Sequence, residues 1–253
     1  MVAGSVLQGR GECREGALSP YPRGHHDHRT CTEPKAARQR AAGRLRGRIR
    51  EAPVSVLLTG FEPFGGDGLN SSWEIARRLD GVDGIRAVQL PCRFAHSLQA
   101  LDAALAHGRP RLVLALGQAA SRPLLSFERV ALNWVDARIA DNDGLQPIDE
   151  PVLPGAPAAH FSTLPIKAMA QAVRGSGVPA EISYSAGSFV CNQVFFGLQH
   201  RLRRRRGVRS GFLHVPALGG ALSLDALVHA VRVALQLALV TPHDVHESAG
   251  RID

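Results

Sequence analysis

The sequence contains a cysteine, a histidine and a glutamate, which are residue types that nucleophilic catalysis uses. The cysteine and the histidine each adjoin a predicted helix or strand. Cys191 is predicted to lie in the first turn of a helix, where unpaired backbone N–H groups and the helix dipole favour a thiolate. His214 ends a short apolar strand. A thiol nucleophile generally needs a base, commonly histidine, and a third group that orients the base. Glu128 is the natural acid to hold the imidazole, so the three residues together indicate hydrolysis through a thiol.

Each of these residues also has an ordinary structural interpretation. Cysteine is a common small core residue, and a histidine at a strand end often bonds only to backbone. A lone glutamate is by default a surface carboxylate. Cys92, which follows another predicted strand, is equally interpretable as a core or a surface thiol. Position alone therefore leaves the catalytic and the structural interpretations open.

The elements that would position these residues are indicated by the hydrophobic pattern. Apolar runs predict strands at 54–59, 85–90, 112–116, 180–185 and 211–215. Helical spacing predicts helices at 71–78, 94–105, 165–173, from about 191, and 224–235. Residues 118–164 look irregular. Alternating apolar strands and helices predict a single α/β domain over residues 53–253, with a mostly parallel twisted sheet and helices on both faces. In such sheets, sites form beyond the carboxyl ends of the strands.

Charge is distributed unevenly along the 253 residues, whose formal net charge is +8. Residues 1–52 hold 11 Lys/Arg against 5 Asp/Glu, whereas the remaining residues hold 19 against 17. The first 52 residues also lack hydrophobic periodicity, so we expect a basic, disordered extension or sequence from an upstream start codon. The alternative is a polyanion-binding protein that uses Arg44–Arg50 and Arg201–Arg206. The nearly neutral body and the lack of a nucleic-acid module argue against nucleic acid as a partner.

Neither a membrane nor a metal site is expected. No apolar run approaches the ~20 residues that span a bilayer, and the basic N-terminal residues are followed by no apolar signal segment. The four cysteines are too scattered for a disulfide framework, which favours a reducing, cytoplasmic location. His25-His-Asp-His28 and Cys31 are metal-binding residue types, but their spacing fits no zinc module well. We therefore expect no metal and no other cofactor.

Seven segments in order resemble the pyroglutamyl peptidase I family, also called pyrrolidone-carboxylate peptidases, over about residues 54–220. The segments are Leu58-Thr-Gly-Phe-Glu-Pro-Phe-Gly-Gly66, Gly117-Gln-Ala119, Glu128-Arg-Val-Ala131, Asp136-Ala-Arg-Ile139 followed by Asp141-Asn142, Phe161-Ser-Thr-Leu-Pro-Ile-Lys167, Ala186-Gly-Ser-Phe-Val-Cys-Asn192 and His214-Val-Pro216. Any one segment is a weak signal, but the seven in this order are highly specific. The resemblance implies a cysteine peptidase that removes an N-terminal pyroglutamyl residue from peptides.

The resemblance also implies roles for individual residues. It implies a triad of Glu128, Cys191 and His214, with Arg138 beside the developing oxyanion. It also implies a set of residues that contact the pyroglutamyl ring by side chain or backbone. These are Phe61, Phe64, Gln118, Ile139, Phe189 and Val190. The family further suggests a homotetramer. An inactive relative that binds such peptides without cleaving them is the remaining alternative, against which the complete triad argues.

Four features of the sequence depart from the family pattern. Residues 1–52 have no counterpart in it, and Ala119-Ala120-Ser121 stands where Gly-Gly is usual. Ala217-Leu218-Gly219 replaces a bulkier stretch that contains proline, and the run Arg201–Arg206 is unusually basic. None of these departures removes a catalytic group.

Deleting residues 1–52 should leave the melting temperature and the activity essentially unchanged, because the segment lacks the apolar content to dock on a core. Thermal unfolding and a hydrolysis assay of the truncated and full-length chains would check this. A large fall in melting temperature would show that the segment packs against the domain.

Overall fold

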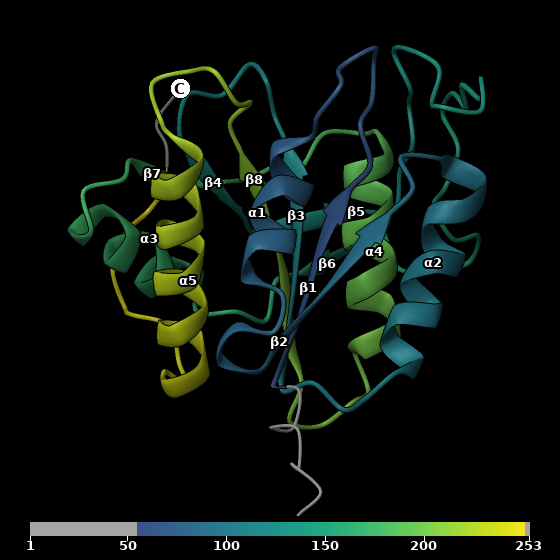
Figure 1. Ribbon diagram of the computed structural model, residues 1–253. Helices are drawn as coiled ribbons and strands as arrows, with labels where there is room; N and C mark the ends of the chain where they lie inside the picture. The colour runs from purple at the N-terminus through teal and green to yellow at the C-terminus, as the bar shows by residue number, and fades with distance from the viewer. Residues whose placement is uncertain (1–54, 251–253) are drawn as a thin grey trace, which may run out of the picture. The chain divides into compact units, whose positions relative to one another are not determined.

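Six strands form an open, mixed sheet in the computed structural model, which describes residues 55–250 (Figure 1). The predicted extension of residues 1–52 lies outside the described residues. The strand order is β2-β1-β3-β8-β4-β7. The strands are β1 (Val56–Phe61), β2 (Ile85–Leu90), β3 (Leu112–Gln118), β4 (Leu125–Glu128), β7 (Ala180–Ser183) and β8 (Arg209–Val215). The predicted α/β class with a mostly parallel sheet is confirmed.

Strand direction changes once across the sheet. Strands β2, β1, β3 and β8 are parallel, whereas β4 pairs antiparallel with β8 and parallel with β7. The carboxyl ends of β1, β3 and β8 therefore meet at one edge, and β4 runs away from that edge. This reversal places Ser126 opposite His214 and Glu128 opposite Phe212, two residues deeper in the sheet.

Helices cover both faces of the sheet, as the sequence predicted. On one face, α1 (Ser71–Leu79), α3 (Ile166–Gly175) and α5 (Leu224–Val240) enclose a core with Leu58, Leu114 and Leu213. On the other face, α2 (Phe94–Ala106) and α4 (Val190–Leu202) enclose a second core with Val113 and Phe212. Figure 1 shows α5 and α3 on one side and α2 and α4 on the other. None of the helices within residues 55–250 is long and apolar enough to cross a bilayer.

The stretch from 118 to 164 holds three strands that the sequence analysis missed. One is β4, and the others are β5 (Val130–Leu132) and β6 (Ala159–Phe161), which form a separate antiparallel pair. Each is only three or four residues long, too short for hydrophobic alternation to identify it. The predicted irregular character is thus wrong at these three places.

Helix α3 takes its N-terminal cap from a segment far along the chain. Pro165 stands at the N-cap position and makes no side-chain cap. Instead, the Asp244 carboxylate accepts hydrogen bonds from the backbone N–H groups of Lys167 (3.1 Å) and Ala168 (2.9 Å). The carboxylate thereby satisfies two of the donors that a helix start leaves unpaired.

Replacing this remote cap should destabilise the fold without touching catalysis. Asp244→Ala should lower the free energy of unfolding by about 0.5–2 kcal/mol, the usual value of a helix cap. For a domain of this size, this corresponds to a melting temperature lower by a few degrees. Thermal unfolding followed by circular dichroism measures the change. An unchanged melting temperature would show that water replaces the cap at no cost.

Candidate active site

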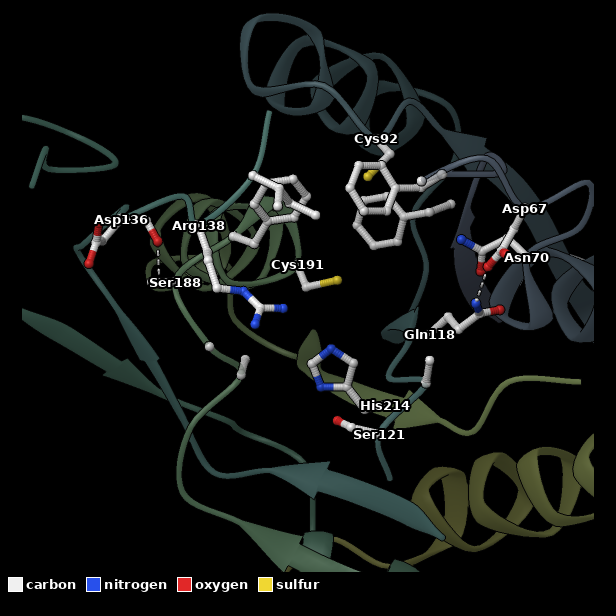
Figure 2. A pocket seen from close by; sticks show the side chains of 18 residues that line it. Asp67, Asn70, Cys92, Gln118, Ser121, Asp136, Arg138, Ser188, Cys191 and His214 are labelled. Atoms are coloured by element: carbon white, nitrogen blue, oxygen red, sulfur yellow. Dashed lines mark hydrogen bonds between the residues drawn. The ribbon is translucent and has the colours of Figure 1, made fainter. Parts of the chain in front are cut away.

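A pocket of about 530 Å³ opens where the carboxyl ends of β1, β3 and β8 meet the start of α4. Phe61 ends β1, Gln118 ends β3, and His214 is the penultimate residue of β8. Cys191, in the first turn of α4, completes the lining (Figure 2). Residues from four separate elements thus converge at the edge where parallel strands end, as the sequence analysis predicted.

Gly117 makes room for the thiol. A Cβ atom on this residue would lie 2.9 Å from Cys191 Sγ and 2.8 Å from the Phe212 ring. Real Cβ contacts of this kind are essentially never so short. The Cys191 and Phe212 side chains therefore fit here because residue 117 is a glycine. Gly117 is also opposite His214 in the β3–β8 register. The thiol therefore packs on the strand next to the imidazole.

Cys191 is half-buried, and neither it nor Cys92 is in a disulfide. Burial raises the pKa of the Cys191 thiol well above its ordinary value. The charges of Cys92 and Glu128 raise this pKa further, and Arg122 lowers it. The sequence analysis expected the helix start to favour a thiolate, whereas burial of the thiol acts in the opposite direction and favours its neutral form. Reaction therefore depends on a neighbouring base that removes the proton.

His214 is held by a buried carboxylate. Its Nδ1 lies 2.7 Å from Glu128 Oε1, and the Glu128 side chain is fully buried. Because Glu128 is opposite Phe212 across the antiparallel pair, it reaches His214 as a diagonal neighbour on the same face of the sheet. An ionised carboxylate only accepts, so Nδ1 donates and Nε2 is left as the basic nitrogen. The carboxylate thus fixes the tautomer that a general base requires.

Arg122 is a contact of this cluster that the sequence analysis did not identify. Its Nη1 donates to the same Glu128 oxygen at 2.7 Å, and its Nη2 donates to the Ser185 carbonyl at 2.9 Å. An arginine six residues before a glutamate carries no spacing signal that would have revealed this pair. Only the turn after β3 brings the guanidinium to the carboxylate.

Arg138 and Ile139 lie on the far wall of the pocket, and both are exposed. Figure 2 shows the Arg138 guanidinium directed toward Cys191 and His214. Their segment is tied to the segment before α4, because Asp136 N donates to Ser188 O (3.1 Å) and Ser188 Oγ to Asp136 O (2.6 Å). These bonds hold the backbone from which the Arg138 guanidinium extends toward the thiol and the imidazole.

Asn192 holds the neighbouring segment and was not singled out by the sequence analysis. Its fully buried amide donates to the carbonyls of Leu132 and Trp134, each at 2.9 Å, and accepts from Leu132 N at 2.9 Å. The residue after the thiol thus fixes the segment that leads into Arg138. A single helical turn positions the nucleophile and, through this amide, the opposite wall.

Aromatic rings form the apolar part of the pocket. Phe189 lies between Phe64 and Phe94, with ring centroids 5.1 Å from each, and Phe94 meets it edge-on. Phe61 is buried and lines the pocket, and its ring centroid lies 6.5 Å from that of Phe212. The rings offer flat surfaces to a planar ligand. Three aromatic residues expected from the sequence, Phe61, Phe64 and Phe189, are thus brought together.

The side chains of Gln118 and Val190 are engaged in the structure and are not free to bind a substrate. The Gln118 side chain is occupied by structure, since its Oε1 accepts from Ser71 N (2.8 Å) and its Nε2 donates to Asp67 Oδ2 (3.2 Å). Only its backbone and one edge remain for a ligand. Val190 is fully buried in the core beneath α4, because successive helical residues point about 100° apart and Cys191 faces the pocket. The Val190 side chain is therefore part of the core, and the backbone is the part of this residue that can still contact substrate.

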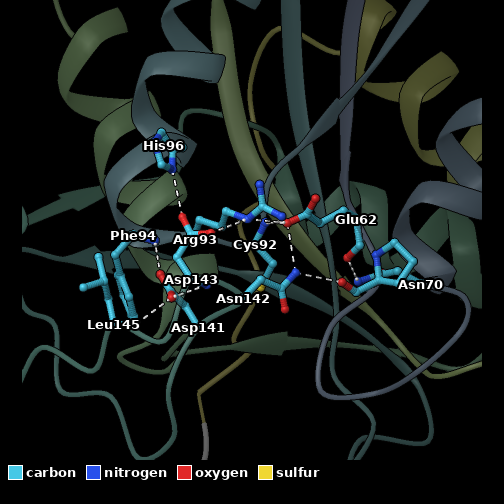
Figure 3. A network of polar contacts seen from close by, with 11 residues as sticks. Glu62, Asn70, Cys92, Arg93, Phe94, His96, Asp141, Asn142, Asp143 and Leu145 are labelled. Carbon is cyan, nitrogen blue, oxygen red and sulfur yellow. Dashed lines mark hydrogen bonds and ion pairs between the residues drawn. The ribbon is translucent and has the colours of Figure 1, made fainter.

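A polar network beside the pocket joins three segments (Figure 3). Arg93 forms ion pairs with Glu62 (3.3 Å) and Asp143 (3.1 Å), and Asn142 donates to Glu62 Oε1 (2.9 Å). Asp141 accepts from Phe94 N at 2.7 Å, which caps the start of α2. Burial opposes ionisation of Asp141, but the backbone N–H groups that it accepts outweigh this and lower its pKa. The segment that carries Arg138 is therefore anchored to β1 and α2.

Across residues 55–250, no group of three or more His, Cys, Asp or Glu side chains is placed to hold a metal ion. The tail cluster of His25, His26, His28 and Cys31 lies outside the described residues. The chemistry available in the pocket is that of a thiol, an imidazole oriented by a carboxylate, and a nearby guanidinium.

A helix-borne thiol beside a carboxylate-held imidazole defines a class of protein, the thiol hydrolases, on a mixed α/β sheet. Comparison with known proteins narrows this class. A family model described as pyroglutamyl peptidase matches residues 54–241. The chain therefore belongs to the pyroglutamyl peptidase family.

Individual relatives agree with this assignment. A pyrrolidone-carboxylate peptidase of Yersinia pestis (strain Pestoides F) is 44% identical over 211 residues, which cover 78% of this chain and 98% of the relative. One of Klebsiella pneumoniae (strain 342) is 54% identical over 169 residues, 65% of this chain and 79% of the relative. The crystal structure of pyroglutamyl peptidase I from Bacillus amyloliquefaciens matches with a TM-score of 0.75 and 39% identity, covering 78% of this chain and all of that chain.

Gly117→Ala should lower kcat strongly, because the added methyl group would occupy the space of Cys191 Sγ and the Phe212 ring. Overpacking of this kind typically costs 1–3 kcal/mol of stability, and the displaced thiol adds a catalytic defect. Steady-state kinetics at a temperature well below unfolding measures it. Gly175→Ala is the matched control, since nothing lies within 4 Å of its Cβ and its φ is not positive. Equal kcat in the two variants would contradict the packing argument.

Proposed function

We propose that this protein removes an N-terminal pyroglutamyl residue from peptides through a thioester formed on Cys191. Membership of the pyroglutamyl peptidase family gives the reaction class. The observation that carries the proposal is the 2.7 Å contact between His214 Nδ1 and the buried Glu128 carboxylate, in the pocket that also holds Cys191. A structural histidine that bonds only to backbone would not need a buried carboxylate partner.

The reaction begins with proton transfer from the thiol. His214 Nε2 accepts the proton of Cys191, and Glu128 stabilises the imidazolium that forms. The thiolate attacks the pyroglutamyl carbonyl, and Arg138 stabilises the tetrahedral oxyanion. The imidazolium then gives its proton to the leaving amine, and the new peptide N-terminus departs. Water, activated by His214, hydrolyses the thioester and regenerates the thiol.

Specificity follows from the shape and polarity of the ligand. Pyroglutamate is a flat, uncharged lactam, so its pocket needs apolar surfaces and one matched donor and acceptor. Phe61, Phe64 and Phe189 supply the surfaces, and backbone groups near Gln118 and Ile139 pair with the lactam N–H and C=O. Proline lacks the lactam carbonyl and would leave a buried donor unpaired, which such sites discriminate against strongly.

The proposal includes a cytoplasmic enzyme that assembles as a homo-oligomer, a tetramer by family resemblance. A thiol that must stay reduced supports a reducing compartment. Exposed large apolar side chains on and beside the β5–β6 pair, Trp134 and Phe161, supply surface of the kind that subunits bury. Size-exclusion chromatography with light scattering determines the number of subunits.

Hydrolysis of a chromogenic pyroglutamyl amide tests the proposal. The wild type should release the amine and leave the corresponding prolyl amide intact, and Cys191→Ser should abolish turnover while keeping the wild-type circular dichroism spectrum. EDTA should not change the rate. A folded wild type that binds the amide without turnover would identify an inactive relative.

Iodoacetamide gives an independent readout of the nucleophile. Because burial raises the pKa of Cys191, its alkylation should accelerate as the pH rises. Cys92 should react more slowly, because it is buried whereas Cys191 is half-buried. Labelling at Cys92 alone, with parallel loss of activity, would refute Cys191 as the nucleophile.

A further inference from the structure

The Glu128 carboxylate is used asymmetrically. Its Oε1 accepts from both His214 Nδ1 and Arg122 Nη1, each at 2.7 Å. Its Oε2 is buried and has no partner within the described residues. Both strong contacts of a fully buried carboxylate therefore converge on one oxygen. The imidazole and the guanidinium share the same negative charge. A change in the contact of one group with the carboxylate therefore changes the electrostatic stabilisation of the other.

Arg122 also connects the three segments that build the catalytic cluster. Its backbone N–H donates to Ala119 O at 3.0 Å, which closes the turn after β3. Its Nη1 contacts Ser183 Oγ (3.3 Å) at the end of β7 as well as Glu128. Its Nη2 holds the Ser185 carbonyl, where the segment that leads to Cys191 begins. One guanidinium thus fixes the carboxylate relative to the segment that carries the nucleophile.

The turn that presents Arg122 tolerates its unusual sequence. Among the described residues, the non-glycine residues with positive φ are Asp83 and Asp149. The run Ala119-Ala120-Ser121, which stands where Gly-Gly is usual, is therefore in ordinary backbone conformations. Replacing glycine at this turn adds no left-handed strain and leaves the arginine in reach of Glu128.

Charge gives this contact a chemical consequence at the thiol. The Glu128 charge raises the pKa of Cys191, and the Arg122 charge lowers it. A carboxylate placed to support imidazolium therefore opposes thiolate formation, and the guanidinium offsets that opposition. The other charged or titratable side chains that line the pocket with His214 are Asp67, Cys92, Asp136 and Arg138. None of these four has a hydrogen bond or ion pair to Glu128 in the described part of the chain.

We propose that Arg122 is a positioning residue of the reaction, which holds the Glu128 carboxylate against His214 and compensates its charge within the catalytic cluster. Arg122 does not line the pocket. This inference rests on the proposed function for its kinetic readout only. Its chemical readout, the reactivity of Cys191, does not require any particular substrate.

Replacing Arg122 by a neutral residue should change how kcat/KM and the alkylation of Cys191 depend on pH. Arg122 Nη1 donates to the same Glu128 oxygen that His214 Nδ1 contacts, so removing the guanidinium takes a positive charge away from direct contact with the catalytic cluster. Arg122→Gln should therefore shift the acidic limb of the kcat/KM profile to higher pH, by about one unit or more for a charge in direct contact. It should lower kcat and leave KM nearly unchanged. The alkylation profile of Cys191 should also move to higher pH.

Conservative and matched variants separate this role from a merely structural one. Arg122→Lys keeps the charge but not the second bond to Ser185, so its acidic limb should stay near that of the wild type while kcat falls. Arg129→Gln is the control, because Arg129 follows Glu128 in the chain but its guanidinium lies 5.3 Å from the Tyr184 ring centroid. Its profile should match the wild type. If Arg122→Gln does not fold, Arg122→Met and the lysine variant provide the same comparison.

A double-mutant cycle tests whether Arg122 acts through Glu128. In a Glu128→Gln background, Arg122→Gln should cost much less kcat/KM than in the wild type, since interacting residues are not additive. Equal losses in the two backgrounds, or an acidic limb that stays in place in Arg122→Gln, would overturn the proposal. A wild type that hydrolyses no pyroglutamyl amide would refute the proposed function instead, and the alkylation profiles would still decide the role of Arg122.

Discussion

The hydrogen bond between His214 and Glu128 depends on one reversal of strand direction. If β4 ran parallel to β8, the carboxyl end of β4 would reach the pocket edge and its last residue would be exposed there. Because β4 is antiparallel to β8, Glu128 lies deeper than His214 and is fully buried. The imidazole therefore has the carboxylate behind it and the pocket in front. The sheet topology therefore determines that the carboxylate lies deeper in the protein than the imidazole.

Reactivity in this pocket is a balance of opposing effects rather than a uniform activation. Burial and nearby negative charge raise the pKa of the Cys191 thiol and so favour its neutral form. In the proposed mechanism, the imidazole that Glu128 orients accepts the proton of this thiol. The absence of a side chain on Gly117 leaves the space that the thiol occupies. A resting neutral thiol also resists oxidation, because the thiolate is the form that oxidants attack.

Sequence patterns predicted most of the frame and part of the site. Long apolar strands such as 112–116 and helices such as 94–105 were identified because their periodicity extends over many residues. The short strands β4, β5 and β6 were not, since three or four residues carry too little pattern. Cys191 and His214 were found because each adjoins a strongly patterned element. Arg122 was missed because its contact with Glu128 lies across the sheet. The resemblance placed Val190 at the substrate, but the sequence could not show that its side chain points into the core.

The remote cap on α3 also bears on how the chain reaches its fold. A ribosome adds residues in order, so Lys167 and Ala168 emerge 77 and 76 residues before the Asp244 that caps them. During that interval, the first turn of α3 has a proline at its N-cap and no side-chain acceptor for these two N–H groups. The helix that covers β4 and β7 is thus completed late in synthesis. A nascent chain that stalls before Asp244 therefore carries an α3 whose first turn lacks this cap, so the helix is less stable there than in the finished protein.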